Sequence, residues 1–137
     1  MMLQLNSALQ DRLRRWANEG YPQECCGLLL GCAGDGVAQV EDVTQARNLN
    51  TERAEDRYEM DPLDLLRADE MARARRLDIV GVWHTHPDHP AQPSATDREQ
   101  AWDGWSYLIL EVGAGGVQAM RSWRLEGPDF VEEVVKP

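Results

Sequence analysis

The sequence predicts an α/β fold with a central mixed β-sheet flanked by helices. Apolar segments of strand length alternate loosely with amphipathic segments of helix length, a pattern typical of helices packed on one mixed sheet. The chain has 137 residues, the size of one domain, and contains no internal repeat, low-complexity tract or Pro/Ser-rich linker. We therefore expect residues 1–137 to fold as a single domain.

The N-terminal region should begin with a short strand and continue as an amphipathic helix. Leu3 and Leu5 supply the strand, and the apolar residues after it recur at helical spacing. Ser7 and Gln10 fit a capping box at the helix start, and Gly20 fits its end. The helical face consists of Leu5, Leu9, Leu13, Trp16 and Ala17.

A β-hairpin and a polar segment should follow. Residues 25–31 form a continuous apolar run typical of a buried strand, whereas residues 37–43 alternate as a half-exposed strand does, with a Gly-Asp-Gly turn at 34–36. Residues 47–57 are polar, charged and poor in strand formers, so we expect a surface loop there. This loop is a candidate lid, although a plain solvated loop fits its composition equally well.

The middle of the chain should hold a second helix and a central strand. Asp61 before Pro62 is a typical helix entry, with the aspartate as the cap and proline at the first helical position. We expect this helix to run to about Arg76. Residues 77–86 (LDIVGVWHTH) predict a central strand, in which Trp83 points into the core.

The C-terminal third should add one helix and three strands. Ser94 opens a second capping-box pattern, for a helix that reaches about Trp102. Residues 107–112 and 117–125 flank a glycine-rich turn, and residues 130–135 should form a last edge strand. Trp102 and Trp105 follow the helix; core packing and the wall of a cleft are both open to them, and core packing is favoured.

The composition argues against several partners. Acidic side chains number 24 against 14 basic ones, and the resulting net charge of −10 repels phosphate backbones and anionic lipid. No basic start is followed by a long apolar run, and no stretch approaches the roughly 20 apolar residues that a membrane-spanning helix needs. We therefore expect a cytoplasmic protein that binds neither nucleic acid nor membrane.

The three cysteines suit reduced thiols better than a disulfide framework. Cys25, Cys26 and Cys32 are odd in number and crowded together, and no CxxC or Cys/His zinc-finger spacing is present. Because Cys25 and Cys26 are adjacent in an apolar run, we expect both in the buried core.

The segment that carries chemistry combines two histidines with an aspartate. Side chains at i and i+2 of a strand point to the same face, so His84 and His86 project together. Asp97 would come from the first turn of the following helix, after a loop whose prolines limit its freedom. Two imidazoles and one carboxylate suit zinc and leave a position open for water, which is typical of a catalytic site. The pattern therefore predicts one Zn2+ per chain.

Each part of this pattern also has a plainer interpretation. A histidine pair on a strand is by itself more often a coincidence than a metal site, and Ser94-x-x-Asp97 by itself is a helix cap. Their conjunction, in a chain with only three histidines, favours the metal site. Capping and ligation are compatible, because Ser94 can fix the helix start while Asp97 binds the ion. We expect His89, in the proline-rich loop, to be exposed and non-ligating.

The sequence His-Thr-His-Pro, a spacer and Pro-Ser-x-x-Asp resembles the signature of the JAMM (MPN+) metalloproteases. Upstream, residues 22–31 (PQECCGLLLG) resemble the segment that supplies a glutamate in that family, and residues 57–62 (RYEMDP) resemble its short bacterial members. The likeness covers roughly residues 3–125. It implies a single MPN-like domain.

The resemblance implies roles for five residues. His84, His86 and Asp97 match the zinc ligands. Glu24 matches the general base that takes a proton from the zinc-bound water, although a glutamate before an apolar strand is more often a solvated surface charge. Ser94 matches the hydroxyl that hydrogen-bonds the tetrahedral intermediate, and a donor against a developing oxyanion is typically worth roughly 3 kcal/mol of barrier.

The same resemblance implies a zinc metallopeptidase whose partner is a ubiquitin-like protein. JAMM enzymes cleave amide bonds at the C-terminal tail of ubiquitin or ubiquitin-like proteins, and this compact chain is similar to the stand-alone bacterial enzymes that act on ubiquitin-like sulfur carriers. We therefore expect hydrolysis of a peptide or isopeptide bond at the carrier's Gly-Gly tail.

Two other classes of function remain open. One is a non-catalytic MPN-type scaffold domain, although such domains typically lack the ligand set that this chain keeps. The other is a zinc hydrolase of small molecules, such as a nucleoside deaminase, whose His-x-Glu and Pro-Cys-x-x-Cys motifs are absent from the sequence.

Overall fold

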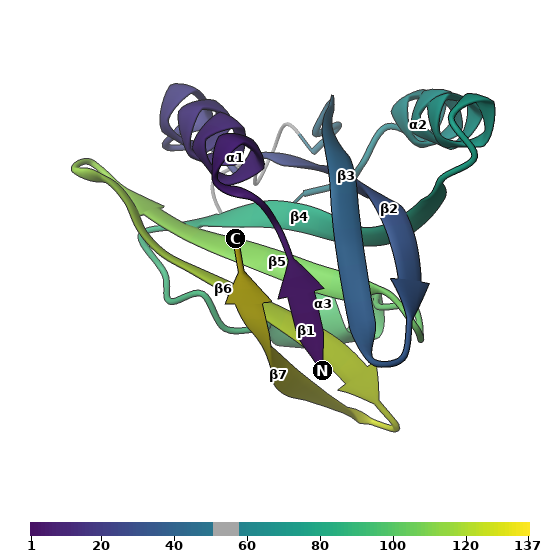
Figure 1. Cartoon of the computed structure of the whole chain (residues 1–137). Coiled ribbons are helices and arrows are strands. Elements are labelled where there is room, and N and C mark those ends of the chain that lie inside the picture. The colour runs from purple at the N-terminus through teal and green to yellow at the C-terminus, as the bar shows by residue number, and fades with distance from the viewer. Residues whose placement is uncertain (51–57) are drawn as a thin grey trace.

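A computed structural model of the chain describes residues 1–50 and 58–137, which form seven strands and three helices. In Figure 1, α1 and α2 lie above the strands, at opposite ends of the picture. The elements in chain order are β1 (Met2–Gln4), α1 (Ser7–Gly20), β2 (Cys26–Gly34), β3 (Val37–Ala46), α2 (Pro62–Ala74), β4 (Asp78–Pro87), α3 (Ala95–Glu99), β5 (Ser106–Gly113), β6 (Gly116–Glu126) and β7 (Asp129–Lys136).

The strands close into one barrel in the order β1-β3-β2-β4-β5-β6-β7. The sheet is mixed, as predicted: β1 runs parallel to β3 and β7, β4 runs parallel to β5, and the other neighbours are antiparallel. The prediction of a last edge strand is wrong, because β7 pairs with β6 on one side and with β1 on the other. The barrel is therefore closed by a strand from the opposite end of the chain.

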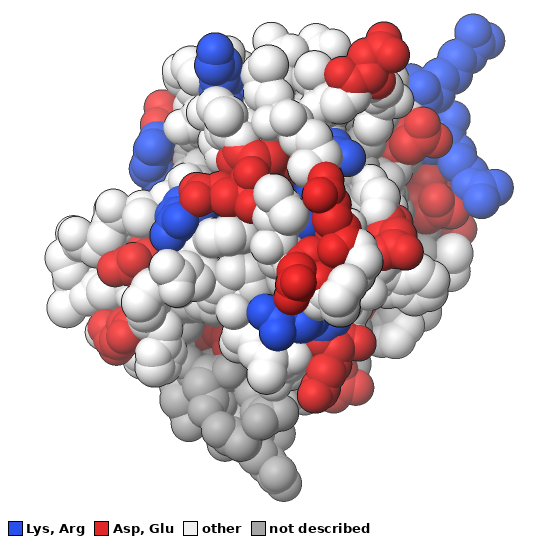
Figure 2. Space-filling view, turned by 90° about the horizontal axis from the view of Figure 1, so that it is seen from below, with Lys and Arg blue, Asp and Glu red and all other residues white. Residues whose placement is uncertain are grey.

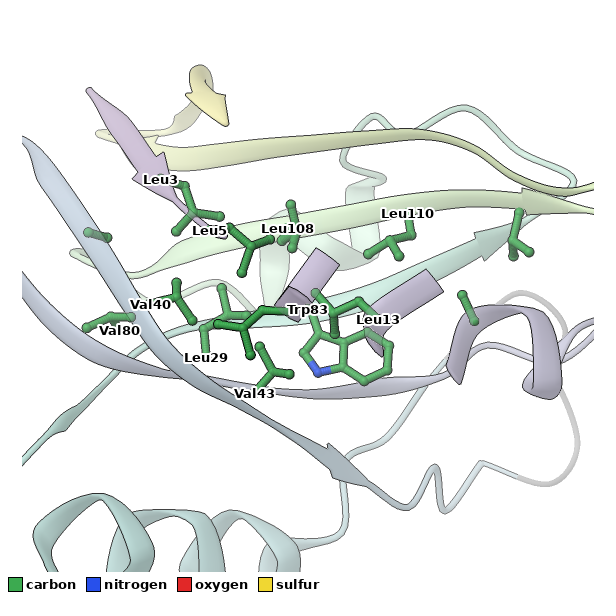
Figure 3. Close-up of a cluster of buried hydrophobic side chains, with 14 residues drawn as sticks. Leu3, Leu5, Leu13, Leu29, Val40, Val43, Val80, Trp83, Leu108 and Leu110 are labelled. Carbon is green, nitrogen blue, oxygen red and sulfur yellow. The ribbon is translucent and has the colours of Figure 1, made fainter. Parts of the chain in front are cut away.

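Strands β2, β4 and β5 are apolar on both faces because each face is covered by its own apolar cluster. Leu29, Trp83 and Leu108 point into the barrel, where they meet one face of α1 (Figure 3). Their sequence neighbours Leu28 and Val82 point outward, against α2. A strand buried on both faces has no polar side to alternate with, which explains the continuous apolar runs in the sequence.

Helix α1 begins differently from the prediction. Asn6 is its N-cap, and the Asn6 side chain accepts a hydrogen bond from the Leu9 amide at 2.9 Å. The predicted capping box of Ser7 with Gln10 is wrong; the Gln10 side chain instead donates to the carbonyl of Leu5 at 2.8 Å. Asparagine is among the strongest N-cap residues, so it fixes the helix start one residue earlier.

The other two helices begin where predicted and end early. Asp61 caps α2 and accepts from the Leu63 amide at 2.9 Å, but the helix ends at Ala74. Helix α3 ends at Glu99 instead of continuing to Trp102. The Trp102 amide, which a longer helix would use internally, donates to the Tyr107 hydroxyl at 2.6 Å. Trp102 is 68% exposed, so the favoured expectation of core packing is wrong for it. Trp105 is half-buried and packs against the apolar cluster under α2.

The prediction for Trp83 is confirmed. Its ring is fully buried and stacks on Trp16 with the ring centroids 5.9 Å apart. The indole Nε1 donates to the carbonyl of Thr44 at 2.8 Å. Gly27 lies beside this hydrogen bond, and any side chain there would collide with both the indole and the carbonyl.

The cysteines are free thiols, as expected, but their burial differs. Cys26 is buried, Cys25 is half-buried and Cys32 is exposed. The prediction that Cys25 lies in the core is therefore wrong. Strand β2 begins only at Cys26, so Cys25 lies at the rim of the barrel rather than inside the sheet.

The surface reflects the acidic composition of the chain. Figure 2 shows acidic side chains spread over one face of the molecule, with basic side chains scattered among them. Such a surface repels polyanions. None of the helices in the described residues has both the length and the apolar content to span a bilayer.

The inner cluster should dominate the stability of the fold. Leu108 is fully buried, whereas Leu63 is 55% exposed. We expect Leu108→Ala to lower the free energy of unfolding by about 2–5 kcal/mol and Leu63→Ala to lower it by less than about 1 kcal/mol. Urea denaturation of the two variants checks this, and equal losses would contradict the assignment of Leu108 to a packed core.

Candidate metal centre and active-site cleft

His84 and His86 lie at the end of β4 and point to the same side of the strand. Both are buried, and their Nε2 atoms are 3.2 Å apart. Residues Trp83 and Thr85, which alternate with them, project to the other face. The two rings therefore present their nitrogens to one point, at the rim where β4 leaves the sheet.

Asp97 reaches the same point from the first turn of α3. Its Oδ1 lies 3.2 Å from Nε2 of His84, and its Oδ2 lies 3.0 Å from Nε2 of His86. Ser94 and Asp97 form a capping box, in which each backbone amide donates to the other side chain, at 2.9 and 3.0 Å. The aspartate is thus held in place by the same hydrogen bonds that start the helix.

Glu24 approaches from the segment just before β2. This residue is only 5% exposed. One ligand atom each from Glu24, His84 and His86 lie within 4.8 Å of one another, which is a candidate metal site. Glu24 is 60 residues from His84 and 62 from His86 in the sequence, and the antiparallel pairing of Cys26 with His84 brings them together in space.

The donor set fits a divalent cation of the zinc type. Nδ1 of His86 lies 2.8 Å from the carbonyl of Pro90. A carbonyl oxygen only accepts, so Nδ1 carries a proton, and in the neutral ring this leaves the lone pair on Nε2 for a ligand. A second imidazole and carboxylate oxygens beside that lone pair are the nitrogen and oxygen donors that zinc takes.

The electrostatics of the site favour neutral His84 and ionised Asp97. Burial lowers the pKa of His84, because an apolar environment disfavours the imidazolium form. Burial alone would raise the pKa of Asp97, but the adjacent rings of His84 and His86 and the hydrogen bond from the Ser94 amide hold it below its ordinary value. Burial likewise opposes charge on His86, yet its contacts with Asp97 and the Pro90 carbonyl raise its pKa.

An open cleft of about 340 Å3 leads to these side chains. Glu24 and Tyr58 line one part of it, and the proline-rich loop and the start of α3 line the rest. Ser94 is exposed at the cleft, and His89 is exposed there as well, as predicted. Trp102 and Trp105 line a different, apolar groove against α2.

Tyr58 is a site residue to which the sequence assigned no role. Its ring stacks on His84 with the centroids 4.8 Å apart, and burial raises the pKa of its hydroxyl. Nδ1 of His84 has no hydrogen-bond partner among the described residues, so this ring is held by its Nε2 contact with Asp97 and by packing on Tyr58. The only sequence signal for Tyr58 was its place in the RYEMDP segment.

The candidate lid at 47–57 is described only in part. Residues 51–57 lie outside the described residues. The flanking chain is fixed: Asn48 pairs with Met60 in an isolated β-bridge, and the Leu49 amide donates to the carbonyl of Glu59 at 2.7 Å. The two flanks of the segment therefore run side by side next to the cleft.

Comparisons with known proteins agree with this fold and site. Residues 6–126 match the family described as prokaryotic homologs of the JAB domain. The chain is 40% identical over 114 residues to a desampylase of Haloferax volcanii, covering 78% of each chain. It is 29% identical over 119 residues to a probable TtuB-protein conjugate cleaving protease of Thermus thermophilus, covering 87% of this chain and 75% of that one.

A solved structure extends the likeness to the fold. The solution structure of a Desulfitobacterium hafniense protein superposes with a TM-score of 0.84 at 28% identity, covering 98% of this chain and 91% of that one. The described part of the chain thus shares its architecture with that protein over almost its whole length. Because the family match spans most of the sequence and includes the buried histidine pair, this protein belongs to the prokaryotic JAB family and is a JAMM-type metalloprotease.

Proposed function

We propose that this chain is a zinc-dependent peptidase that hydrolyses a peptide or isopeptide bond at the C-terminal Gly-Gly tail of a ubiquitin-like carrier protein. The observation that carries the proposal is the convergence of two buried imidazoles, a capped aspartate and a buried glutamate at the base of an open cleft. The names of its relatives, a desampylase and a protease that cleaves TtuB-protein conjugates, support a protein conjugate as the substrate.

His84, His86 and Asp97 would hold the zinc ion. All three direct donor atoms to the same point, and the protonated Nδ1 of His86 leaves its Nε2 available. When bound, zinc acts as a Lewis acid, which polarises a carbonyl and lowers the pKa of a bound water molecule toward neutral pH. Three protein ligands leave a coordination position open, as catalytic sites require.

Glu24 would act as the general base. Its carboxylate lies beside the histidine nitrogens and lines the cleft, so a water molecule that attacks the scissile carbonyl can deliver a proton to it. The same carboxyl group can return that proton to the amine that leaves. One group therefore serves both proton transfers, first as base and then as acid.

Ser94 would stabilise the developing oxyanion. Its Oγ accepts the Asp97 amide at 3.0 Å, and a hydroxyl that accepts one hydrogen bond keeps its own proton for donation. Ser94 is exposed at the cleft, where a substrate carbonyl can reach it. The capping box thus orients the hydroxyl before substrate arrives.

The shape of the cleft favours an extended tail as substrate. A volume of about 340 Å3 takes a few small residues and excludes a folded domain. A flexible C-terminal tail without side chains can enter, while the body of the carrier protein stays outside. This agrees with a cut after a Gly-Gly sequence.

Metal analysis tests the ligand set. We expect about one zinc per chain in the purified protein, and a loss of zinc affinity of more than about 100-fold for His86→Ala, since even outer-shell partners contribute 10–100-fold. His89→Ala is the matched control and should keep the metal. Plasma mass spectrometry and zinc titration measure both variants, and a scaffold domain would show no stoichiometric zinc in either.

Cleavage of an extended carrier tests the base. We expect a ubiquitin-like protein extended beyond Gly-Gly to lose the mass of the extension, and a chelator to abolish the reaction. Glu24→Gln should keep its zinc and lose roughly 10²–10⁴-fold in rate, the usual contribution of general acid–base catalysis. A fully active Glu24→Gln enzyme would show that the base is another group.

Ser94 variants test the oxyanion donor. We expect Ser94→Ala to lower kcat by roughly 10²–10³-fold, whereas Ser94→Thr keeps a hydroxyl and most of the activity. Zinc content is measured alongside kcat, because Ser94 also caps the helix that carries Asp97. A Ser94→Ala enzyme with full kcat and full zinc would contradict the role.

A further inference from the structure

Glu24 lies just outside the sheet, although its carboxylate must keep a fixed position relative to the histidines to act as the base. Strand β2 pairs with β4 as far as Cys26, which lies opposite His84. Glu24 comes two residues earlier, in a segment that no regular strand pairing includes. A carboxylate on such a segment needs other contacts to keep a fixed distance from the histidines.

The first of these contacts comes from Thr85, the residue between the two histidines. The Thr85 amide donates to the carbonyl of Cys25 at 3.0 Å. A regular antiparallel pair would return a second backbone hydrogen bond. Here the Cys25 amide donates instead to the side-chain Oγ1 of Thr85 at 2.8 Å. Because Thr85 is fully buried, this hydroxyl faces the backbone next to Glu24 and not solvent.

The second contact comes from Asn48, on the opposite side of Glu24. Its side-chain Nδ2 donates to the backbone carbonyl of Glu24 at 3.1 Å. The Oδ1 of the same amide accepts from the backbone of Asn50 at 3.0 Å and of Glu59 at 2.9 Å. One side chain thus ties the Glu24 segment to the chain that leads to Tyr58.

We propose that Thr85 and Asn48 are positioning residues that hold the Glu24 backbone between them and so fix its carboxylate against the metal ligands. The two hydrogen bonds act on the Glu24 carbonyl and on the amide of the next residue, which are the two polar groups of one peptide unit. With both groups held, that peptide plane cannot rotate, and the Cα of Glu24 keeps its place. The inference rests on the proposed role of Glu24 as base.

The choice of threonine in His-Thr-His then has a physical reason. A valine at position 85 would fill the same buried space but leave the Cys25 amide without its acceptor. A serine would keep the oxygen. The hydroxyl, and not the size of the side chain, is what the site requires.

The test compares Thr85→Val with Thr85→Ser, both loaded with zinc. We expect Thr85→Val to lower kcat by roughly 10²-fold with KM unchanged, because a displacement of about 1 Å in a reacting group costs rates of that order. Thr85→Ser should retain most of the wild-type kcat. Full kcat in Thr85→Val, an equal loss in Thr85→Ser, or loss of zinc from Thr85→Val alone would each overturn the inference.

A second readout does not depend on activity. The Cys25 amide should exchange its hydrogen slowly in the wild-type protein and in Thr85→Ser, and at least about 10-fold faster in Thr85→Val, as measured by NMR without metal. Unchanged exchange in Thr85→Val would show that the hydroxyl does not hold this amide. This measurement stands even if Glu24→Gln proves active and the role of Glu24 as base fails.

Asn48→Asp provides an independent variant if Thr85→Val does not fold. It removes the donor to the Glu24 carbonyl while keeping an oxygen for the amides of Asn50 and Glu59. We expect a lower kcat with KM and zinc content unchanged. An Asn48→Asp enzyme with wild-type kcat would overturn the part of the inference that concerns Asn48.

Discussion

The burial of β4 on both faces is the constraint on which the rest of the structure depends. The barrel interior covers one face of the strand through Trp83, and the cluster under α2 covers the other through Val82. A strand packed in this way has little freedom to shift or to change register. The C-terminal end of β4 therefore holds His84 and His86 in fixed positions. The other groups of the site lie around these two residues.

The two carboxylate residues of the site are held near β4 by hydrogen bonds rather than by apolar packing. Asp97 is held by the capping box with Ser94, and the Glu24 segment is held by hydrogen bonds to Thr85 and Asn48. Tyr58 adds an aromatic contact to His84. A rigid strand thus carries the histidines, and short hydrogen-bonded segments carry the carboxylates. The open cleft lies above these fixed groups.

Several groups of the site serve two purposes. Asp97 accepts a hydrogen bond from the Ser94 amide and also faces the histidines. Ser94 caps α3 by accepting a hydrogen bond from the Asp97 amide, while its own proton remains available at the cleft. Collecting buried histidines and carboxylates costs solvation energy, which their mutual contacts offset only in part. The stability that the two apolar clusters provide is what allows the fold to keep such a site at its rim.

The sequence by itself determined the element types, the buried strand at 25–31, the central strand at 77–86 and the placement of His84 and His86 on one face. These follow from local periodicity, and a strand places alternate side chains on one face whatever its surroundings. The motif resemblance also pointed to Glu24, Ser94 and Asp97. Only the tertiary structure decided that β7 pairs with β1 to close the barrel and that α3 ends before Trp102. It also decided that Cys25 lies at the rim. The contacts of Thr85, Asn48 and Tyr58 around the site were likewise decided by the tertiary structure. The end of α3 depends on the contact of the Trp102 amide with Tyr107, five residues further on. The others depend on contacts between segments far apart in the chain, and local sequence patterns do not show which distant donor will meet which acceptor.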